Sequence, residues 1–325
     1  MYPKSVRTLA AERELANKLE ALQASVEKVI RGKHEVVRLA LVTLLSKGHL
    51  LIEDVPGVGK TTLAHALARS FDCTFQRIQF TSDLLPSDLT GVSVFNQLER
   101  QFEFRKGPLF ANVVLADEIN RTTPKTQSAL LEAMSEGKVS VDDRTHSLPQ
   151  PFIVIATQNP IEHHGTYPLP ESQVDRFMMR LRIGYPGRED EKQILRSQIT
   201  YQMADRLIPV MTAEEVIAAQ QAVDKVQLSE ELLDYLMAVV EATRRSEYLQ
   251  LGISPRGALA LYRAAQAAAY LAGREYCVPD DIKDLVVPVF AHRVTVSPKY
   301  SSPLDDSQEA ASVIENLLKK IPVPL

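Results

Sequence analysis

The chain has 325 residues, of which 45% are hydrophobic, so it is long enough to form two domains with buried cores. Its formal net charge of -4 gives no support for a general nucleic-acid binder, which would carry a basic surface. Its two cysteines, Cys73 and Cys277, fit neither a disulfide framework nor a metal-ligand spacing. The N-terminus lacks an apolar signal core, and no stretch approaches the about 18 apolar residues that span a bilayer. We therefore expect a cytoplasmic protein that binds no nucleic acid and is not inserted in a membrane.

Helices and short apolar strands alternate through the first half of the chain. Helical spacing of apolar residues predicts helices at 9–31 and 34–47, which end at Gly32 and Gly48. Nearly continuous apolar runs predict strands of a parallel sheet that is covered on both faces. The four predicted strands are residues 49–53, 75–80, 113–117 and 152–157.

The first predicted strand leads into the stretch EDVPGVGKTT, residues 53–62. A phosphate-binding loop needs backbone N–H groups at a helix N-terminus and a lysine over the terminal phosphates. Lys60 is placed to reach the β- and γ-phosphates, and Thr61 to bind Mg²⁺. The usual pattern has glycine where this chain has Asp54, and we expect the loop to survive because aspartate tolerates left-handed backbone. The predicted nucleotide-binding residues of this loop are Gly57, Val58, Gly59, Lys60, Thr61 and Thr62.

Polar side chains also follow the third and fourth predicted strands. In VVLADEINR, residues 113–121, Asp117 can hold Mg²⁺ through water, and Glu118 is placed to orient and deprotonate an attacking water. In FIVIATQNP, residues 152–160, Asn159 could hydrogen-bond the γ-phosphate or the water, or simply form an Asn-Pro turn. The residues alone leave both interpretations of Asn159 open.

The remaining patterns predict a helix, a hairpin and a second, helical domain. A helix at 123–136 is expected to begin at Thr122 or Thr123 and to end at Gly137. Two extended pieces around a polar turn predict a hairpin at 137–150. From about residue 188 only helical patterns follow, one of which opens with a capping box from Thr212 to Glu215. We therefore predict an α/β nucleotide-binding core with N-terminal helices at 1–187 and a helical lid at 188–325.

The motifs EDVPGVGKTT, ADEINR, ATQNP, LPESQVDRF and SPRGAL together resemble the MoxR family of AAA+ ATPases, in order and over nearly the whole chain. The resemblance implies a P-loop core with a parallel sheet between helices, followed by a helical lid, and it implies hydrolysis of ATP with Mg²⁺. Segment 84–106 resembles the helix-2 insertion of this clade, and the 137–150 hairpin its pre-sensor-1 hairpin.

The same resemblance assigns roles to single residues. Lys60 and Thr61 match its Walker A motif, Asp117 and Glu118 its Walker B motif, and Asn159 its sensor 1. Arg176, within Asp175-Arg176-Phe177, matches the arginine finger, which acts on the nucleotide of a neighbouring subunit and so implies a ring, expected to be a hexamer. Arg256, early in a lid helix, matches sensor 2. A guanidinium at either place can stabilise the charge of the transition state.

The family is associated with maturation or remodelling of client proteins, including partners with a von Willebrand factor A domain. A metal-chelatase motor subunit shares much of this architecture and is an open alternative. A DNA motor or transcription activator is another, although the chain shows no added DNA-binding domain. Glu118 argues against a scaffold that does not hydrolyse its nucleotide. A GTPase is disfavoured because Asn159 is followed by proline, so it does not begin the Asn-Lys-x-Asp motif that recognises guanine.

Overall fold

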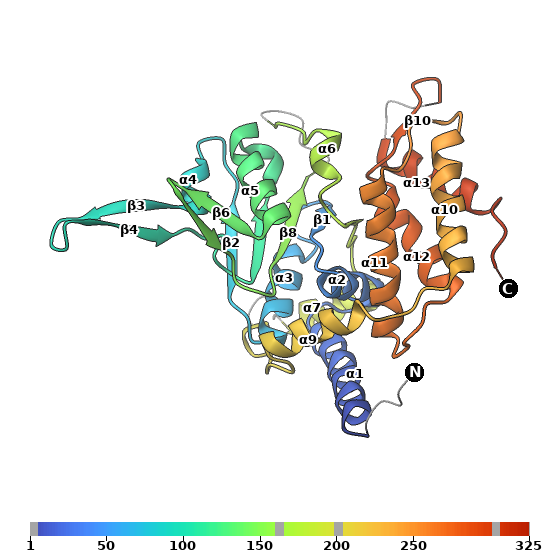
Figure 1. Ribbon diagram of the computed structural model, residues 1–325, viewed down its shortest axis with the longest axis horizontal. Coiled ribbons are helices and arrows are strands. Elements are labelled where there is room, and N and C mark those ends of the chain that lie inside the picture. Colours follow the sequence, from blue (N-terminus) through green and yellow to red (C-terminus); the bar gives the residue numbers. More distant parts are fainter. Residues whose placement is uncertain (1–5, 160–165, 198–203, 301–305, 325) are drawn as a thin grey trace.

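The computed structural model describes residues 6–159, 166–197, 204–300 and 306–324. An α/β part lies beside a group of helices formed by the C-terminal third of the chain (Figure 1). The five-stranded sheet has the order β2-β5-β8-β1-β9, and each neighbouring pair is parallel. Its strands are β1 (Leu50–Glu53), β2 (Phe75–Gln79), β5 (Val113–Asp117), β8 (Ile153–Gln158) and β9 (Met179–Leu181). The four predicted strands are therefore confirmed to within a residue at each end, and β9 was not predicted.

The N-terminal helices and those that follow strands cover the sheet. They are α1 (Val6–Glu27), α2 (His34–Leu45), α3 (Lys60–Ser70) and α5 (Pro124–Glu136). The predicted helix 9–31 ends earlier, at Glu27. Gly32 lies in the turn before α2 and has a φ of +69°. Helix α5 has the expected bounds, because Thr123 precedes it with extended backbone and Gly137 ends it in the left-handed conformation.

Two hairpins interrupt the alternation of strands and helices. The segment that resembles a helix-2 insertion forms the short helix α4 (Pro86–Thr90) and a long hairpin of β3 (Gly91–Asn96) and β4 (Gln101–Lys106), which projects away from the sheet (Figure 1). Gly91 begins this hairpin at φ +94°, where a Cβ would lie 2.2 Å from the carbonyl oxygen of Arg105. The predicted hairpin at 137–150 is confirmed as β6 (Lys138–Val141) and β7 (Arg144–Ser147).

The C-terminal region is mostly helical. Its helices are α7 (Arg188–Ser197), α9 (Ala213–Val223), α10 (Glu230–Arg245), α11 (Pro255–Leu271), α12 (Pro279–Phe290) and α13 (Asp306–Leu318). The Thr212–Glu215 capping box is present at α9. The expectation of helices alone is wrong, because β10 (Leu249–Leu251) and β11 (Thr295–Val296) form an antiparallel pair. Strands of three and two residues are too short to leave a periodic pattern. No helix among the described residues is long and apolar enough to cross a membrane.

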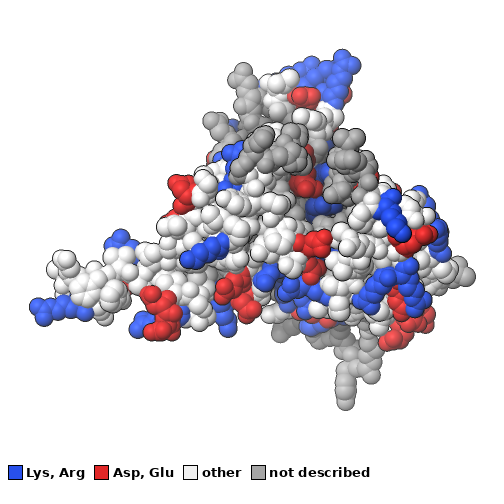
Figure 2. All heavy atoms as spheres, turned by 90° about the horizontal axis from the view of Figure 1, so that it is seen from above, with Lys and Arg blue, Asp and Glu red and all other residues white. Residues whose placement is uncertain are grey.

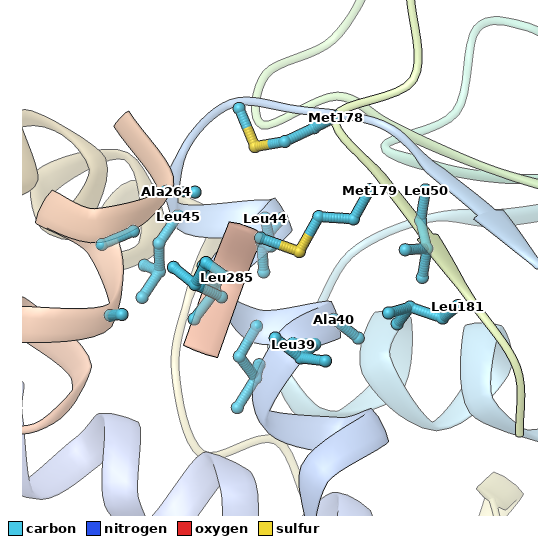
Figure 3. Close-up of a cluster of buried hydrophobic side chains, with 14 of the residues drawn as sticks. Leu39, Ala40, Leu44, Leu45, Leu50, Met178, Met179, Leu181, Ala264 and Leu285 are labelled. Carbon is cyan, nitrogen blue, oxygen red and sulfur yellow. The ribbon is translucent and has the colours of Figure 1, made fainter. Parts of the chain in front are cut away.

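One hydrophobic cluster runs from the sheet into the C-terminal helices. Helix α2 lies between them, and its residues Leu39, Ala40, Leu44 and Leu45 are drawn with their neighbours in Figure 3. On one side lie Leu50 of β1 and Met179 and Leu181 of β9; on the other lie Ala264 of α11 and Leu285 of α12. Burial of these side chains removes apolar surface from water and so stabilises the contact between the two parts of the chain. Packing through α2 therefore sets the position of the C-terminal helices relative to the sheet.

Candidate nucleotide site

The loop between β1 and α3 has the backbone of a phosphate-binding loop. Gly57 and Gly59 have φ values of +86° and +97°, where residues with a Cβ are strained, and Gly59 directly precedes the first turn of α3. A Cβ on Gly57 would meet nothing within 4 Å, so the space beside this residue is open. The N–H groups at the start of α3 have no partners within the helix, and this end of the helix dipole favours an anion.

Asp54 has a different role from the one that its tolerance of left-handed backbone suggested. It is not among the positive-φ residues of the described chain, so that explanation is wrong. Asp54 is buried, with 8% of the residue exposed to solvent. Its carboxylate accepts two backbone hydrogen bonds, from Val55 N at 2.8 Å and from Gly184 N at 2.6 Å. Gly184 lies just beyond β9. Asp54 therefore fastens the loop to the segment that leads toward the C-terminal helices.

Lys60 points back along the loop. Its Nζ donates to the carbonyl oxygen of Asp54 at 2.5 Å and to that of Gln158 at 3.4 Å. Burial lowers the pKa of Lys60, and the negative charges of Asp54 and Asp117 oppose that shift. A half-buried ammonium with acidic neighbours stays charged at neutral pH, as a phosphate ligand requires.

The loop and the carboxyl ends of β2, β5 and β8 surround a hollow of about 370 Å³. Ligands commonly bind outside the carboxyl ends of the strands of a parallel sheet. The hollow brings together most of the predicted nucleotide and metal residues, including Asn159, which is 6% exposed. Val58 is the exception in the loop, since its side chain packs against the hydrophobic core. The residues that line the hollow are Pro56, Gly57, Gly59, Lys60, Thr61, Thr62, Arg77, Gln79, Asp117, Glu118 and Asn159.

The two predicted Walker B acids are joined by Thr157, which the sequence reasoning missed. Its buried hydroxyl donates to Asp117 Oδ1 at 2.6 Å and accepts from the backbone N–H of Glu118 at 2.9 Å. Thr157 belongs to an apolar run in the sequence, so its polarity gave no signal there. The pairing of β5 with β8, in which Ala116 lies opposite Ala156, brings its hydroxyl to the acids.

Two polar residues of β2 also contact the acids. Arg77 donates to Asp117 Oδ2 from Nη2 at 2.7 Å and from Nε at 3.1 Å, and Gln79 Nε2 donates to Glu118 Oε2 at 2.7 Å. Sequence reasoning missed both, although polar residues at the end of a strand next to β5 were a usable signal. Glu118 itself has φ +59° and ψ +51°, a strained conformation that non-glycine residues adopt mostly where function requires it.

The two predicted arginines lie outside this hollow. Arg176 follows the short helix α6 (Glu171–Val174), and its Nη1 donates to Leu131 O at 3.0 Å and to Ser135 Oγ at 2.6 Å, both on α5. Arg256 is the second residue of α11 and is exposed. Neither arginine is among the residues that line the hollow of this chain.

The side chains present fit Mg²⁺ and a triphosphate. Mg²⁺ prefers oxygen ligands, and the Thr61 hydroxyl and the Asp117 carboxylate face the same hollow. The left-handed glycines and Lys60 line the same hollow, and their backbone N–H groups and ammonium suit phosphate oxygens. These groups can hold a phosphate chain and its metal while a carboxylate, Glu118, faces the same space.

Comparisons with known proteins show which family the chain resembles. A family model described as "ATPase family associated with various cellular activities (AAA)" matches residues 49–179, and one described as "AAA lid domain" matches residues 241–317. The chain is 40% identical to Chaperone MoxR1 of Mycobacterium tuberculosis, and the alignment covers 99% of this chain and 86% of that protein. It is 47% identical to the uncharacterized protein YeaC of Bacillus subtilis, with 92% of this chain and 93% of that protein covered. Protein MoxR of Paracoccus denitrificans is 30% identical, with 93% and 95% covered. The crystal structure of a candidate ATPase from Cytophaga hutchinsonii superposes with a TM-score of 0.89 at 37% identity, covering 98% of each chain.

Proposed function

The chain belongs to the MoxR family of AAA+ ATPases, and from that premise we propose that it binds ATP with Mg²⁺ in the hollow at Lys60 and hydrolyses it. One observation carries the proposal: a loop with two left-handed glycines, Lys60 and the acid pair Asp117 and Glu118 all face one space. This set of groups supplies what phosphoryl transfer to water needs, namely positioning, charge neutralisation and a base.

Each side chain has a distinct part in this proposal. The N–H groups of the loop and Lys60 hold the phosphates, while Thr61 and Asp117 hold Mg²⁺. The bound metal would neutralise charge on the phosphate oxygens. Glu118 orients the attacking water and takes its proton as a general base. Asn159, buried at the end of β8, fixes the water or the terminal phosphate by hydrogen bonding.

The base of the nucleotide has room next to the loop. A second hollow of about 470 Å³ is lined by residues of the α1–α2 turn, among them Ile30 and Lys33, and by Asp190 of α7. Ile30 reaches the phosphate loop, since its Cδ1 would lie 3.9 Å from a Cβ on Gly59. We assign the base and ribose to this second hollow because Ile30, one of its lining residues, lies beside Gly59 of the phosphate loop.

Arg176 and Arg256 complete the proposal in a homo-oligomeric ring, which we take to be a hexamer. Arg176 lies outside the hollow of its own chain, so it is assigned to the phosphates of the neighbouring subunit, where its charge would stabilise the transition state. Arg256 is assigned to the nucleotide of its own chain, which would link nucleotide state to the position of α11.

Hydrolysis would drive chaperone-like remodelling of client proteins in the cytoplasm, including partners with a von Willebrand factor A domain. Two observations support this part: the relative from M. tuberculosis is named a chaperone, and the β3–β4 hairpin exposes large apolar side chains. Figure 2 shows this hairpin as an arm whose outer part is mostly uncharged, with a basic group at its outer end and charged residues of both signs closer to the body of the protein. Contiguous exposed apolar residues mark surfaces that bind other proteins. The exposed fractions are 50% for Phe95, 95% for Leu98 and 69% for Phe102.

Nucleotide binding and turnover of point variants test the core of the proposal. Lys60→Ala is expected to lose binding of a fluorescent ATP analogue, whereas Glu118→Gln should bind it normally and lose turnover by at least about 100-fold. Lys125→Ala, which removes an exposed lysine on α5, is the matched control and should behave as the parent chain. Tight binding by Lys60→Ala would contradict the site, and normal turnover by Glu118→Gln would contradict the base.

Subunit mixing tests the ring. Arg176→Ala is expected to bind ATP and to lose turnover. When it is mixed with Lys60→Ala, some interfaces combine an intact Lys60 with an intact Arg176, so part of the activity should return. For the client surface, the double variant Phe95→Ser, Phe102→Ser should keep basal turnover and lose suppression of aggregation of a denatured model protein. A Val92→Ser variant at the base of the same hairpin is the control for a general change in the arm.

A further inference from the structure

A buried arginine joins the C-terminal helices to the segment that carries Arg176. Arg293 follows α12, and its side chain is 2% exposed. Burying a guanidinium is costly unless its N–H groups are paired. Here Nε donates to Asp175 Oδ1 at 2.8 Å, Nη2 to Phe177 O at 2.6 Å and Nη1 to Met178 O at 2.9 Å, and a further bond goes to Val289 O. Burial lowers the pKa of Arg293 to about 10 against the opposing effect of Asp175, so the guanidinium is charged at neutral pH.

Nη2 also donates to the backbone carbonyl oxygen of Asp175 at 3.3 Å, so these bonds hold the backbone on both sides of Arg176. Asp175 precedes Arg176, and Phe177 and Met178 follow it. The adjacent His292 also contacts Phe177 O, from Nε2 at 3.0 Å. Burial lowers the pKa of His292 well below its usual value, so the ring is neutral and Nε2–H donates this bond. Two consecutive residues at the end of α12 therefore fix the position from which Arg176 extends toward α5.

The other side of Arg293 supports the first turn of α11. A Cβ on Gly257 would lie 3.0 Å from Arg293 Cδ and 2.9 Å from Ile253 Cγ2, so this glycine rests directly on the arginine side chain. Gly257 follows Arg256, and the charge of Arg256 is close enough to contribute to lowering the pKa of Arg293. A single side chain thus separates the first turn of α11 from the segment of Arg176.

We propose that Arg293 is a positioning residue that couples the two arginines assigned to nucleotides, Arg256 at the site of its own chain and Arg176 at the site of its neighbour. A shift of the first turn of α11 would press on Arg293, which is bonded to the backbone around Arg176. The inference rests on the proposed function, because it takes the roles of both arginines from there. It adds the physical contact through which the nucleotide of one subunit would affect hydrolysis in the next.

The test compares Arg293→Lys with Arg176→Ala in the intact chain. Lysine keeps the charge but lacks the planar set of donors that reaches four partners at once. We expect Arg293→Lys to assemble as the parent does by light scattering, to bind the ATP analogue within about twofold, and to lose kcat by about tenfold or more. Arg245→Lys on α10, where the side chain is 80% exposed, is the control and should change neither value.

A double-mutant cycle separates coupling from a merely structural role. If Arg293 acts through Arg176, the double variant Arg293→Lys, Arg176→Ala should be no slower than Arg176→Ala alone. Mixing Arg293→Lys with Lys60→Ala subunits should restore turnover, since the latter supply a correctly held Arg176. Additive losses in the cycle, or a normal kcat for Arg293→Lys while Arg176→Ala is inactive, would overturn the inference. Normal turnover by Arg176→Ala would instead refute the proposed function.

A second variant keeps the inference testable if Arg293→Lys does not fold. Gly257→Ala removes no donor or acceptor of the Arg293 hydrogen bonds and adds one methyl group 3.0 Å from Arg293 Cδ and 2.9 Å from Ile253 Cγ2. We expect a smaller loss of kcat, about three- to tenfold, with the affinity for the ATP analogue nearly unchanged. Ala258→Gly, at the next position of the same helix turn, is its control. An unchanged kcat for Gly257→Ala would likewise overturn the inference.

Discussion

Asp54 allows the sharpest test of how the phosphate-binding loop is held. Asp54→Ala removes the acceptor of two backbone N–H groups, those of Val55 and Gly184. Hydrogen bonds to a charged group are worth roughly 1.5–3 kcal/mol each, and Gly184 is half-buried, so water can replace part of its bond. A total loss of roughly 2–4 kcal/mol follows. With an unfolding entropy of about 2.1 cal/mol/K per residue, each kcal/mol corresponds to roughly 1.5 °C for a chain of this length. The expected fall in Tm is therefore roughly 3–6 °C.

Differential scanning calorimetry without nucleotide measures this shift directly. Asp234→Ala is the matched control, because it removes an exposed aspartate from α10 and should change the Tm by less than about 1 °C. Asp54→Gly restores the residue that the usual loop pattern has and should lower the Tm as much as Asp54→Ala does. If Asp54→Gly were as stable as the parent, the carboxylate would not fasten the loop, and the reasoning from its two hydrogen bonds would be refuted.

Three further predictions concern the acids and a buried histidine. Arg77→Ala frees Asp117 from a half-exposed ion pair worth roughly 0.2–1 kcal/mol. Turnover should then reach half of its maximum at a roughly 1.5- to 5-fold lower Mg²⁺ concentration, and a higher Mg²⁺ concentration at half-saturation would contradict the prediction. Thr157→Val should slow turnover by roughly tenfold with normal binding of the ATP analogue, because it removes the hydroxyl between Asp117 and Glu118. Burial lowers the pKa of His49 to about 4, so between pH 6.5 and 4 the folded state binds fewer protons than the unfolded state. The free energy of unfolding therefore falls by roughly 3 kcal/mol as the pH drops from 6.5 to 4. The Tm of His49→Gln should therefore depend less steeply on pH in that window, and an equal slope would contradict this.

Features of the fold that depend on neighbouring residues could be predicted from the sequence. Strand β5 has the predicted bounds because four apolar residues run directly into an acid pair. Helix α5 also has them, since Thr123 and Gly137 mark its ends by their own backbone preferences. The sequence also predicted that Lys60, Thr61 and Asp117 line one hollow, because parallel strands bring their carboxyl ends to one edge of the sheet.

Features that depend on distant partners could not be predicted in this way. Thr157 contacts the acids only because β8 pairs with β5 in a particular register, and β10 with β11 is a pair too short to show a pattern. The role of Asp54 was misjudged for the same reason. Its partner Gly184 is 130 residues away, so a preference of the aspartate backbone was the only signal available near it.

The long-range contacts of Arg293 and Asp54 lie on the two sides of β9. Arg293 holds the residues just before this strand, 118 positions away in sequence, and Asp54 holds Gly184 just after it. Among the strands that the structure describes, β9 is an edge strand of three residues that pairs with β1 alone, and β1 leads into the phosphate-binding loop. A strand this short and paired on one side contributes few ladder hydrogen bonds of its own. Asp54 and Arg293 therefore add to the core packing of Met179 and Leu181 in fixing its position. The phosphate-binding loop and the segment of Arg176 are therefore attached to opposite ends of one short element.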